Sequence, residues 1–256
     1  MTTLTYHDDP DFKARVVRAA EDHREADRFV QGEYLDTSDD EWRGCSVGCT
    51  VAPLLAAERG VPVTKVVGSR WHEEESRLLG IPEWLARVQD QIFEGLRDDH
   101  IEWTPRLLAA IPVGVSHESL GAARDEWLRD LLHDPERGAI PAAAQSLRRA
   151  GRDDSASDLE RITRETPIGE VRSRCYTAAN AADSHTTAAY VTSAAADAAV
   201  GVFYASNPDS THAAAAAGAA AAAADDGAWW AWAGDAWWTW AGDRLLDRLT
   251  DTGADR

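Results

Sequence analysis

Apolar residues recur at helical spacing through most of the first 150 residues. One helical face is shared by residues separated by four, three, four, three and four positions, namely Phe12, Val16, Ala19, His23, Ala26 and Val30. Asp9-Pro10-Asp11 is typical of a helix start, because proline is tolerated in the first turn and acidic residues complement the helix dipole. The pattern predicts a first helix that ends near Gln31-Gly32.

The same periodicity predicts further helices along this half of the chain. They cover residues 47–59 with Gly60 as the stop, 71–79, a helix opened by Ile81-Pro82, 101–112 and 119–132. Only the run 61–67 is short and β-branched like a strand, and it is equally consistent with an extended connector. These elements predict an all-α protein.

Composition changes along the second half of the chain. Residues 151–172 have the character of a linker, and residues 173–256 are rich in alanine and tryptophan. We therefore expect a helical domain at 1–150, followed by the linker and an alanine-rich helical hairpin or bundle. An octad with three tryptophans occurs twice, at 228–235 and 236–243, and we expect these side chains to pack against the first domain or to form a homo-oligomer or partner interface.

A net charge of −18 opposes binding to phosphate groups. It argues against nucleic acid and anionic membranes as partners, and indicates a solubilising surface or one that imitates nucleic acid. The start has no signal-peptide pattern and no window approaches the roughly 18 apolar residues of a membrane span, so we expect a cytoplasmic protein. Three cysteines do not make a disulfide framework, so they are expected to be thiols.

Two of the cysteines lie in Gly44-Cys45-Ser46-Val47-Gly48-Cys49, where a polar loop meets an apolar helix. Cys45 is expected at or just before the helix N-terminus, where the dipole lowers a thiol pKa and favours a nucleophilic thiolate. Backbone N–H groups of Gly44 and Gly48 could then bind an oxyanion. Two alternatives stay open: buried structural cysteines, or a metal or redox pair formed by Cys45 and Cys49.

Several residues are candidates for proton transfer at Cys45. His23 is the first candidate base, oriented by Asp27, although it could instead be a histidine at the edge of the core. His7 and His72 are alternative bases. Carboxylates recur on one helix side at Glu83, Asp90 and Glu94, a row typical of a solvated face and less often of a metal or acid/base site. Neither H-E-x-x-H nor a phosphate-binding glycine loop occurs.

The chain resembles an uncharacterised family of bacterial and phage helical proteins. The shared features are Tyr6-His7, His23 with Asp27, Gly32-Glu33-Tyr34, the G-C-x-V-G-C segment at 44–49, the stretch from Leu79 to Ala86, and an Ala/Trp-rich C-terminus. The resemblance implies that the cysteine segment is a site, without implying an activity. Gly44, Gly48, Cys49 and Tyr34 are therefore the expected binding residues.

These observations favour a cysteine-dependent enzyme, a small-molecule hydrolase or transferase with Cys45 as nucleophile, His23 as base and Asp27 as its orienting group. No cofactor is implied and no metal site is predicted. The alternative is a non-enzymatic acidic interaction protein, of phage or mobile-element type, that captures a host protein. The expected partner is accordingly a small-molecule substrate or a protein.

Overall fold

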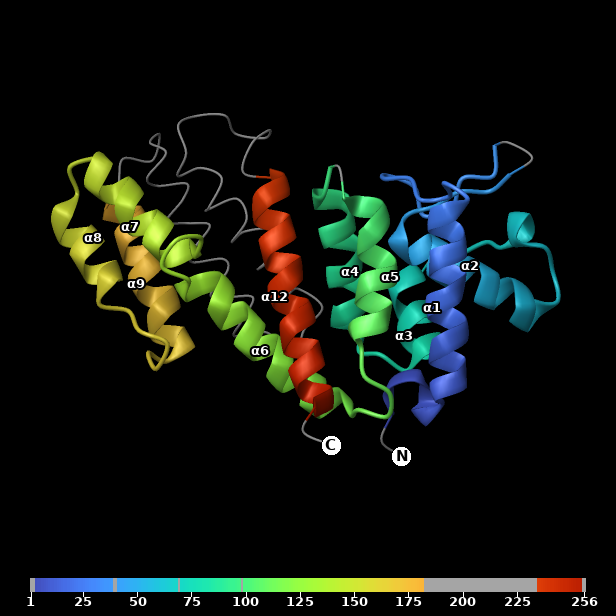
Figure 1. Cartoon of the computed structure of the whole chain (residues 1–256). Helices are drawn as coiled ribbons and strands as arrows, with labels where there is room; N and C mark the ends of the chain where they lie inside the picture. Colours follow the sequence, from blue (N-terminus) through green and yellow to red (C-terminus); the bar gives the residue numbers. More distant parts are fainter. Residues whose placement is uncertain (1–2, 39–40, 69, 98, 182–233, 255–256) are drawn as a thin grey trace. The chain divides into compact units, whose positions relative to one another are not determined.

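The computed structural model describes residues 3–38, 41–68, 70–97, 99–181 and 234–254 (Figure 1). Within these ranges the chain forms helices and no sheet, so the predicted all-α fold is confirmed. The helices are η1 (Thr5–Asp8), α1 (Pro10–Glu25), α2 (Ser46–Arg59), η2 (Val63–Lys65), α3 (Trp71–Leu79), α4 (Glu83–Gly95), α5 (His100–Ala110), α6 (His117–His133), α7 (Ala139–Arg149), α8 (Asp153–Glu160), α9 (Ile168–Ala181) and α12 (Gly234–Ala254). The run 61–67 is a connector that contains the short turn η2, not a strand.

The chain divides into two compact units. Unit 1 consists of Met1–Ala123 with Leu245–Arg256, and unit 2 consists of Arg124–Arg244. In unit 1, α2 packs against α1, α3 and α4, while α5 packs against α1 and α4. The fully buried side chains of this unit include Leu55, Leu79, Leu85, Phe93 and Leu107. Leu55 and Leu85 are among the apolar positions that the helical spacing predicted.

The ends of α1 and α2 follow from local chemistry. Asp9 caps α1, because its Oδ1 accepts hydrogen bonds from the backbone N–H groups of Asp11 and Phe12, both at 2.9 Å. The helix ends at Glu25, earlier than predicted, because Asp27 takes a left-handed conformation with φ 52° and turns the chain away. Gly60 ends α2 in the left-handed conformation, as predicted.

The N-terminal Tyr-His pair lies in a strained turn before α1. Tyr6, His7 and Asp8 all have positive φ, which is costly for residues with a side chain. Two long-range contacts hold this turn: the Tyr6 hydroxyl donates to the Leu108 carbonyl at 2.7 Å, and a ring nitrogen of His7 lies 2.8 Å from the Leu78 carbonyl. The His7 ring therefore binds a backbone carbonyl and helps to hold this turn.

Unit 2 contains helix within the segment expected to be a linker. Within residues 151–172, α8 packs against α7 and α9 through buried Ala156 and Leu159. The second tryptophan octad lies in α12, where Trp237 is buried and donates to the Arg137 carbonyl at 3.3 Å. Residues 228–233, which carry the tryptophans of the first octad, lie outside the described residues. The predicted homo-oligomer through these tryptophans stays a prediction.

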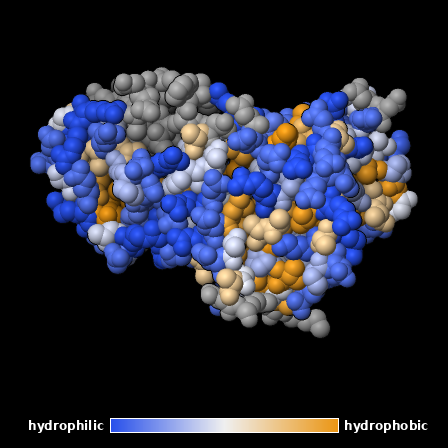
Figure 2. Space-filling model, viewed as in Figure 1, coloured by the Kyte–Doolittle hydropathy of each residue, from blue (hydrophilic) through white to orange (hydrophobic). Residues whose placement is uncertain are grey.

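Hydrophilic residues cover most of the face shown in Figure 2, and apolar residues form separate small patches on it. None of the described helices is long and apolar enough to cross a membrane.

Candidate functional site

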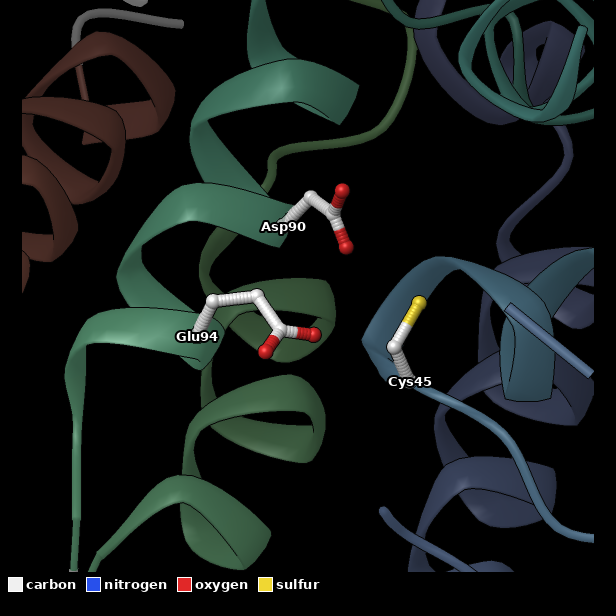
Figure 3. Close-up of side chains that lie close together, drawn as sticks. All are labelled: Cys45, Asp90 and Glu94. Atoms are coloured by element: carbon white, nitrogen blue, oxygen red, sulfur yellow. The ribbon is translucent and has the colours of Figure 1, made fainter. Parts of the chain in front are cut away.

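Three potential metal-ligating side chains converge in unit 1 (Figure 3). The Sγ of Cys45 and one carboxylate oxygen each from Asp90 and Glu94 all lie within 4.8 Å of one another. Cys45 is the residue before α2, as the sequence predicted, and the two acidic residues are one turn apart on α4. Because residues four apart share a helix face, α4 presents both carboxylates to the sulfur.

The backbone before α2 explains how Cys45 reaches this position. Gly44 pairs with the segment after α1, donating its N–H to the Arg28 carbonyl at 3.0 Å and accepting from Val30 at 2.9 Å. The Cys45 N–H donates to the Glu33 carbonyl at 2.8 Å. The N–H groups of Gly44 and Cys45 are thus committed to fixing the loop.

Both glycines of the segment allow a close approach of the Tyr34 backbone. A Cβ atom on Gly44 would lie 2.4 Å from the Tyr34 carbonyl oxygen, and one on Gly48 would lie 1.5 Å from the same oxygen. Neither distance is possible for a side chain. The glycines therefore have a clear packing role, and the Gly44 N–H, which donates to the Arg28 carbonyl, is not free for the oxyanion-binding role expected from the sequence.

Asp90 is held by two side chains from other parts of unit 1. Its Oδ2 accepts from the Tyr34 hydroxyl at 3.2 Å and from His72 Nε2 at 3.1 Å. The Tyr34 ring in turn stacks on Trp71, with centroids 5.8 Å apart and planes 11° from parallel. Tyr34 and His72 thus orient Asp90, which belongs to the carboxylate row that the sequence analysis read as typical of a solvated face.

Glu94 is held by the loop that follows α1. The Gly32 N–H donates to both carboxylate oxygens, at 3.1 and 3.0 Å. The neighbouring Gln31 amide donates to the carbonyls of Phe93 and Leu96 at 2.7 and 2.5 Å, which ties this loop to the end of α4. Burial raises the pKa of Glu94, and the Asp90 charge adds to that shift while the Gly32 hydrogen bond opposes it.

The Cys45 thiol is buried beside these carboxylates, with 1% of the residue exposed. Burial raises its pKa most, and the negative charge of Asp90 and a hydrogen bond to it raise it further. Backbone N–H groups of Gly48 and Val47 oppose the shift but do not overcome it. The lowering of the Cys45 pKa by the helix terminus, expected from the sequence, is therefore present but smaller than the raising by burial and Asp90. The thiol is protonated at neutral pH.

Unpaired polar atoms lie in the core between α3 and α4. Glu75 and Gln89 are fully buried, and neither the carboxylate of the first nor the amide of the second has a hydrogen-bond partner among the described residues. Asp90 Oδ1 is unpaired in the same sense. Burial raises the pKa of Glu75 well above its usual range, Asp90 adds to this, and the nearby Gln89 amide opposes it. Such groups are costly unless a proton or a cation compensates them.

The expected base and its orienting group lie in another part of unit 1. The His23 ring contacts Trp42 and Phe29, with centroids 5.0 and 6.4 Å away, and it lines a cavity together with Cys49. Burial lowers the pKa of His23 to about 4, and Arg28 lowers it further while Asp22 opposes the shift. Asp27 is exposed. Among the described residues, the potential metal-ligating groups that converge on Cys45 are those of Asp90 and Glu94.

Cys49 does not face the same groups as Cys45. Its thiol is buried and points to backbone oxygens, 3.3 Å from the Gly44 carbonyl and 3.5 Å from that of Arg28. Burial raises its pKa to about 12. These contacts fit the buried structural cysteine that the sequence left open as an alternative.

Comparison of the chain with protein-family models, curated proteins and solved structures gave no match.

Proposed function

We propose that this protein is a metal-dependent enzyme that binds a divalent transition-metal ion of the zinc class through Cys45, Asp90 and Glu94. The observation that carries the proposal is the convergence of one sulfur and two carboxylate oxygens within 4.8 Å. Thiolate and carboxylate are both zinc ligands, and three protein ligands leave a fourth tetrahedral position for water. A water bound there would be activated for hydrolysis of a small-molecule substrate.

The present geometry needs little change to accept an ion. Ligand atoms around tetrahedral zinc lie about 3.4–3.6 Å apart, so the three atoms would move together by about 1 Å or slightly more. The Tyr34 and His72 contacts to Asp90 and the Gly32 contact to Glu94 are the kind of outer contacts that orient metal ligands.

Metal binding at this site requires the Cys45 thiol to lose its proton. Zinc binds the thiolate, so the ion must displace the proton that Cys45 carries when the site is empty. Apparent metal affinity should therefore rise with pH. The same ion would remove the main obstacle to thiolate formation, which is burial beside Asp90.

Two other functions have support from particular observations. The backbone N–H groups of Val47 and Gly48 that act on the Cys45 sulfur favour the cysteine nucleophile expected from the sequence. The net charge of −18 favours an acidic interaction protein that captures a host protein. The first requires a reactive thiol in the metal-free protein, and the second requires no chemistry at Cys45 at all.

Titration of the metal-free full chain with Co²⁺ and Zn²⁺ tests the proposal. We expect one Co²⁺ ion to bind with a sulfur-to-metal charge-transfer band, and Zn²⁺ to displace it. Cys45→Ser should abolish the band, and Asp90→Asn should weaken binding about 10–100-fold or more. Glu83→Gln is the matched control, because Glu83 is on the same helix but pairs with Arg87. Absence of the band in the folded wild-type chain would rule out a Cys45 metal site.

Hydrolysis of a panel of small carboxylic and phosphate esters tests the enzymatic part. Activity should fall on chelation, return with Zn²⁺ and be lost in Asp90→Asn. Activity that survives chelation but is blocked by alkylation of Cys45 would instead support the cysteine nucleophile.

A further inference from the structure

The cavity in unit 1 that His23 and Cys49 line lies between α1 and α2 and has a volume of about 240 Å³. Its walls are mainly apolar, formed by Val16, Ala19, Ala20, Phe29, Pro53 and Leu54. Engineered apolar cavities of roughly 150 Å³ stay dry and bind molecules such as benzene. The size of this cavity therefore suits a ligand of one ring, smaller than the occupants of typical drug-sized pockets.

The polar groups that line the cavity carry no charge at neutral pH, with one exception at its edge. His23 is neutral because burial lowers its pKa to about 4, and the Cys49 thiol is neutral because burial raises its pKa to about 12. The Thr50 hydroxyl is committed to the Ser46 carbonyl at 2.8 Å. The exception is Arg15, whose side chain is 66% exposed and lies over the Phe12 ring.

One lining residue has hydrogen-bonding capacity that the described residues do not use. The His23 imidazole makes ring contacts with Trp42 and Phe29 but no hydrogen bond within the described part of the chain. The cavity thus combines an apolar wall with a neutral imidazole.

We propose that this cavity binds a small, uncharged, mainly aromatic molecule that carries a single hydroxyl or N–H group. The apolar ring packs against Val16, Ala19 and Leu54, and the polar group bonds to His23. A charge inside the cavity is disfavoured, because it would lose water there, and the one charged lining residue, Arg15, lies at the exposed edge. This inference goes beyond the proposed metal site and does not depend on it.

Calorimetric titration of the full chain with phenol and with toluene tests the proposal, because the two probes differ in one hydroxyl group. Phenol should bind saturably and at least tenfold more tightly than toluene. Ala19→Leu fills the cavity and should weaken phenol binding tenfold or more. Ala14→Leu is the matched control, since Ala14 is exposed on the same helix, and should leave binding unchanged.

His23→Phe keeps a ring in the wall but removes its nitrogens, so it should bring phenol binding down to the level of toluene. Circular dichroism and melting curves establish whether each variant is folded. If Ala19→Leu does not fold, phenol binding by His23→Phe tests the proposal in its place. Equal binding of the two probes by the wild-type chain would overturn the polar contact. Failure of both to bind would overturn the cavity as a ligand site, as would an equal loss in Ala14→Leu and Ala19→Leu.

Discussion

The carbonyl oxygen of Tyr34 occupies the space that a Cβ atom on Gly48 would need, at a distance of 1.5 Å. This contact fixes the loop of residues 31–34 against the first turn of α2. The same loop supplies the Tyr34 hydroxyl to Asp90 and the Gly32 N–H to Glu94. A single close approach thus positions two carboxylates relative to Cys45.

Gly48→Ala should therefore destabilise the protein by about 1–3 kcal/mol, as overpacking does, and should displace the loop from Asp90. Gly121→Ala is the control, because a Cβ atom there meets nothing within 4 Å and α6 gains from losing a helical glycine. Urea denaturation measures both. Equal stability of Gly48→Ala and wild type would show that the loop moves freely, contrary to the structure.

All three thiols should react slowly with iodoacetamide in the metal-free native protein at about pH 7. Each cysteine is buried, and burial raises the pKa of Cys49 and Cys175 to about 12 and that of Cys45 as well. Peptide mapping by mass spectrometry measures labelling at each residue, with the urea-unfolded chain as the reference for complete reaction. Selective rapid labelling of Cys45 would contradict this expectation and favour the cysteine nucleophile.

His23 should make the protein less stable as pH falls from about 6.5 to about 4. Its pKa is lower in the folded chain, so the unfolded chain binds more protons in this window and stability rises with pH across it. Because the ring is only half-buried, we expect a loss of about 1–2 kcal/mol and not the full value of the shift. Urea denaturation measures the free energy of unfolding of wild type and His23→Phe at both ends of this pH window. The free energy should change less with pH in His23→Phe, and an equal change in the two proteins would contradict the assignment.

Glu75→Gln should stabilise the metal-free protein above neutral pH. The folded pKa of Glu75 is raised, so native Glu75 holds its proton longer than the unfolded chain does, and stability falls as pH rises above the ordinary carboxyl pKa. Removing the ionisable group should recover about 1–3 kcal/mol. Glu73→Gln, on the exposed side of the same helix, is the control. Melting curves at about pH 5 and about pH 8 measure the effect.

Local sequence patterns predict where a site residue lies on its own helix better than they predict which residues pack against it. Helical spacing and Gly60 place Cys45 at the start of α2, because both signals act within one element. The same spacing puts Asp90 and Glu94 in a row on α4, but a row on one helix does not reveal what packs against it. Only the packing of α2 on α4 turns that row toward the sulfur, so a pattern typical of a solvated face became part of the candidate site.

The pairing of His23 with Cys45 remains a prediction from sequence that this geometry does not favour. It assumed that the apolar stripe of α1 continued to Val30 and that a helix N-terminus alone sets the thiol pKa. Instead α1 ends at Glu25, and His23 packs with Trp42. Burial beside Asp90 is a tertiary effect on the Cys45 pKa, and no spacing along the chain carries information on it.

The division of the chain also has a consequence for synthesis on the ribosome. Unit 1 contains Met1–Ala123 and Leu245–Arg256, so the last part of this unit is translated only after the whole of unit 2. Gly253, where a Cβ atom would lie 3.1 Å from the Pro112 side chain, belongs to that late part. The helices that carry Cys45, Asp90 and Glu94 therefore emerge early, while the unit that contains them stays incomplete until residues 245–256 have been translated.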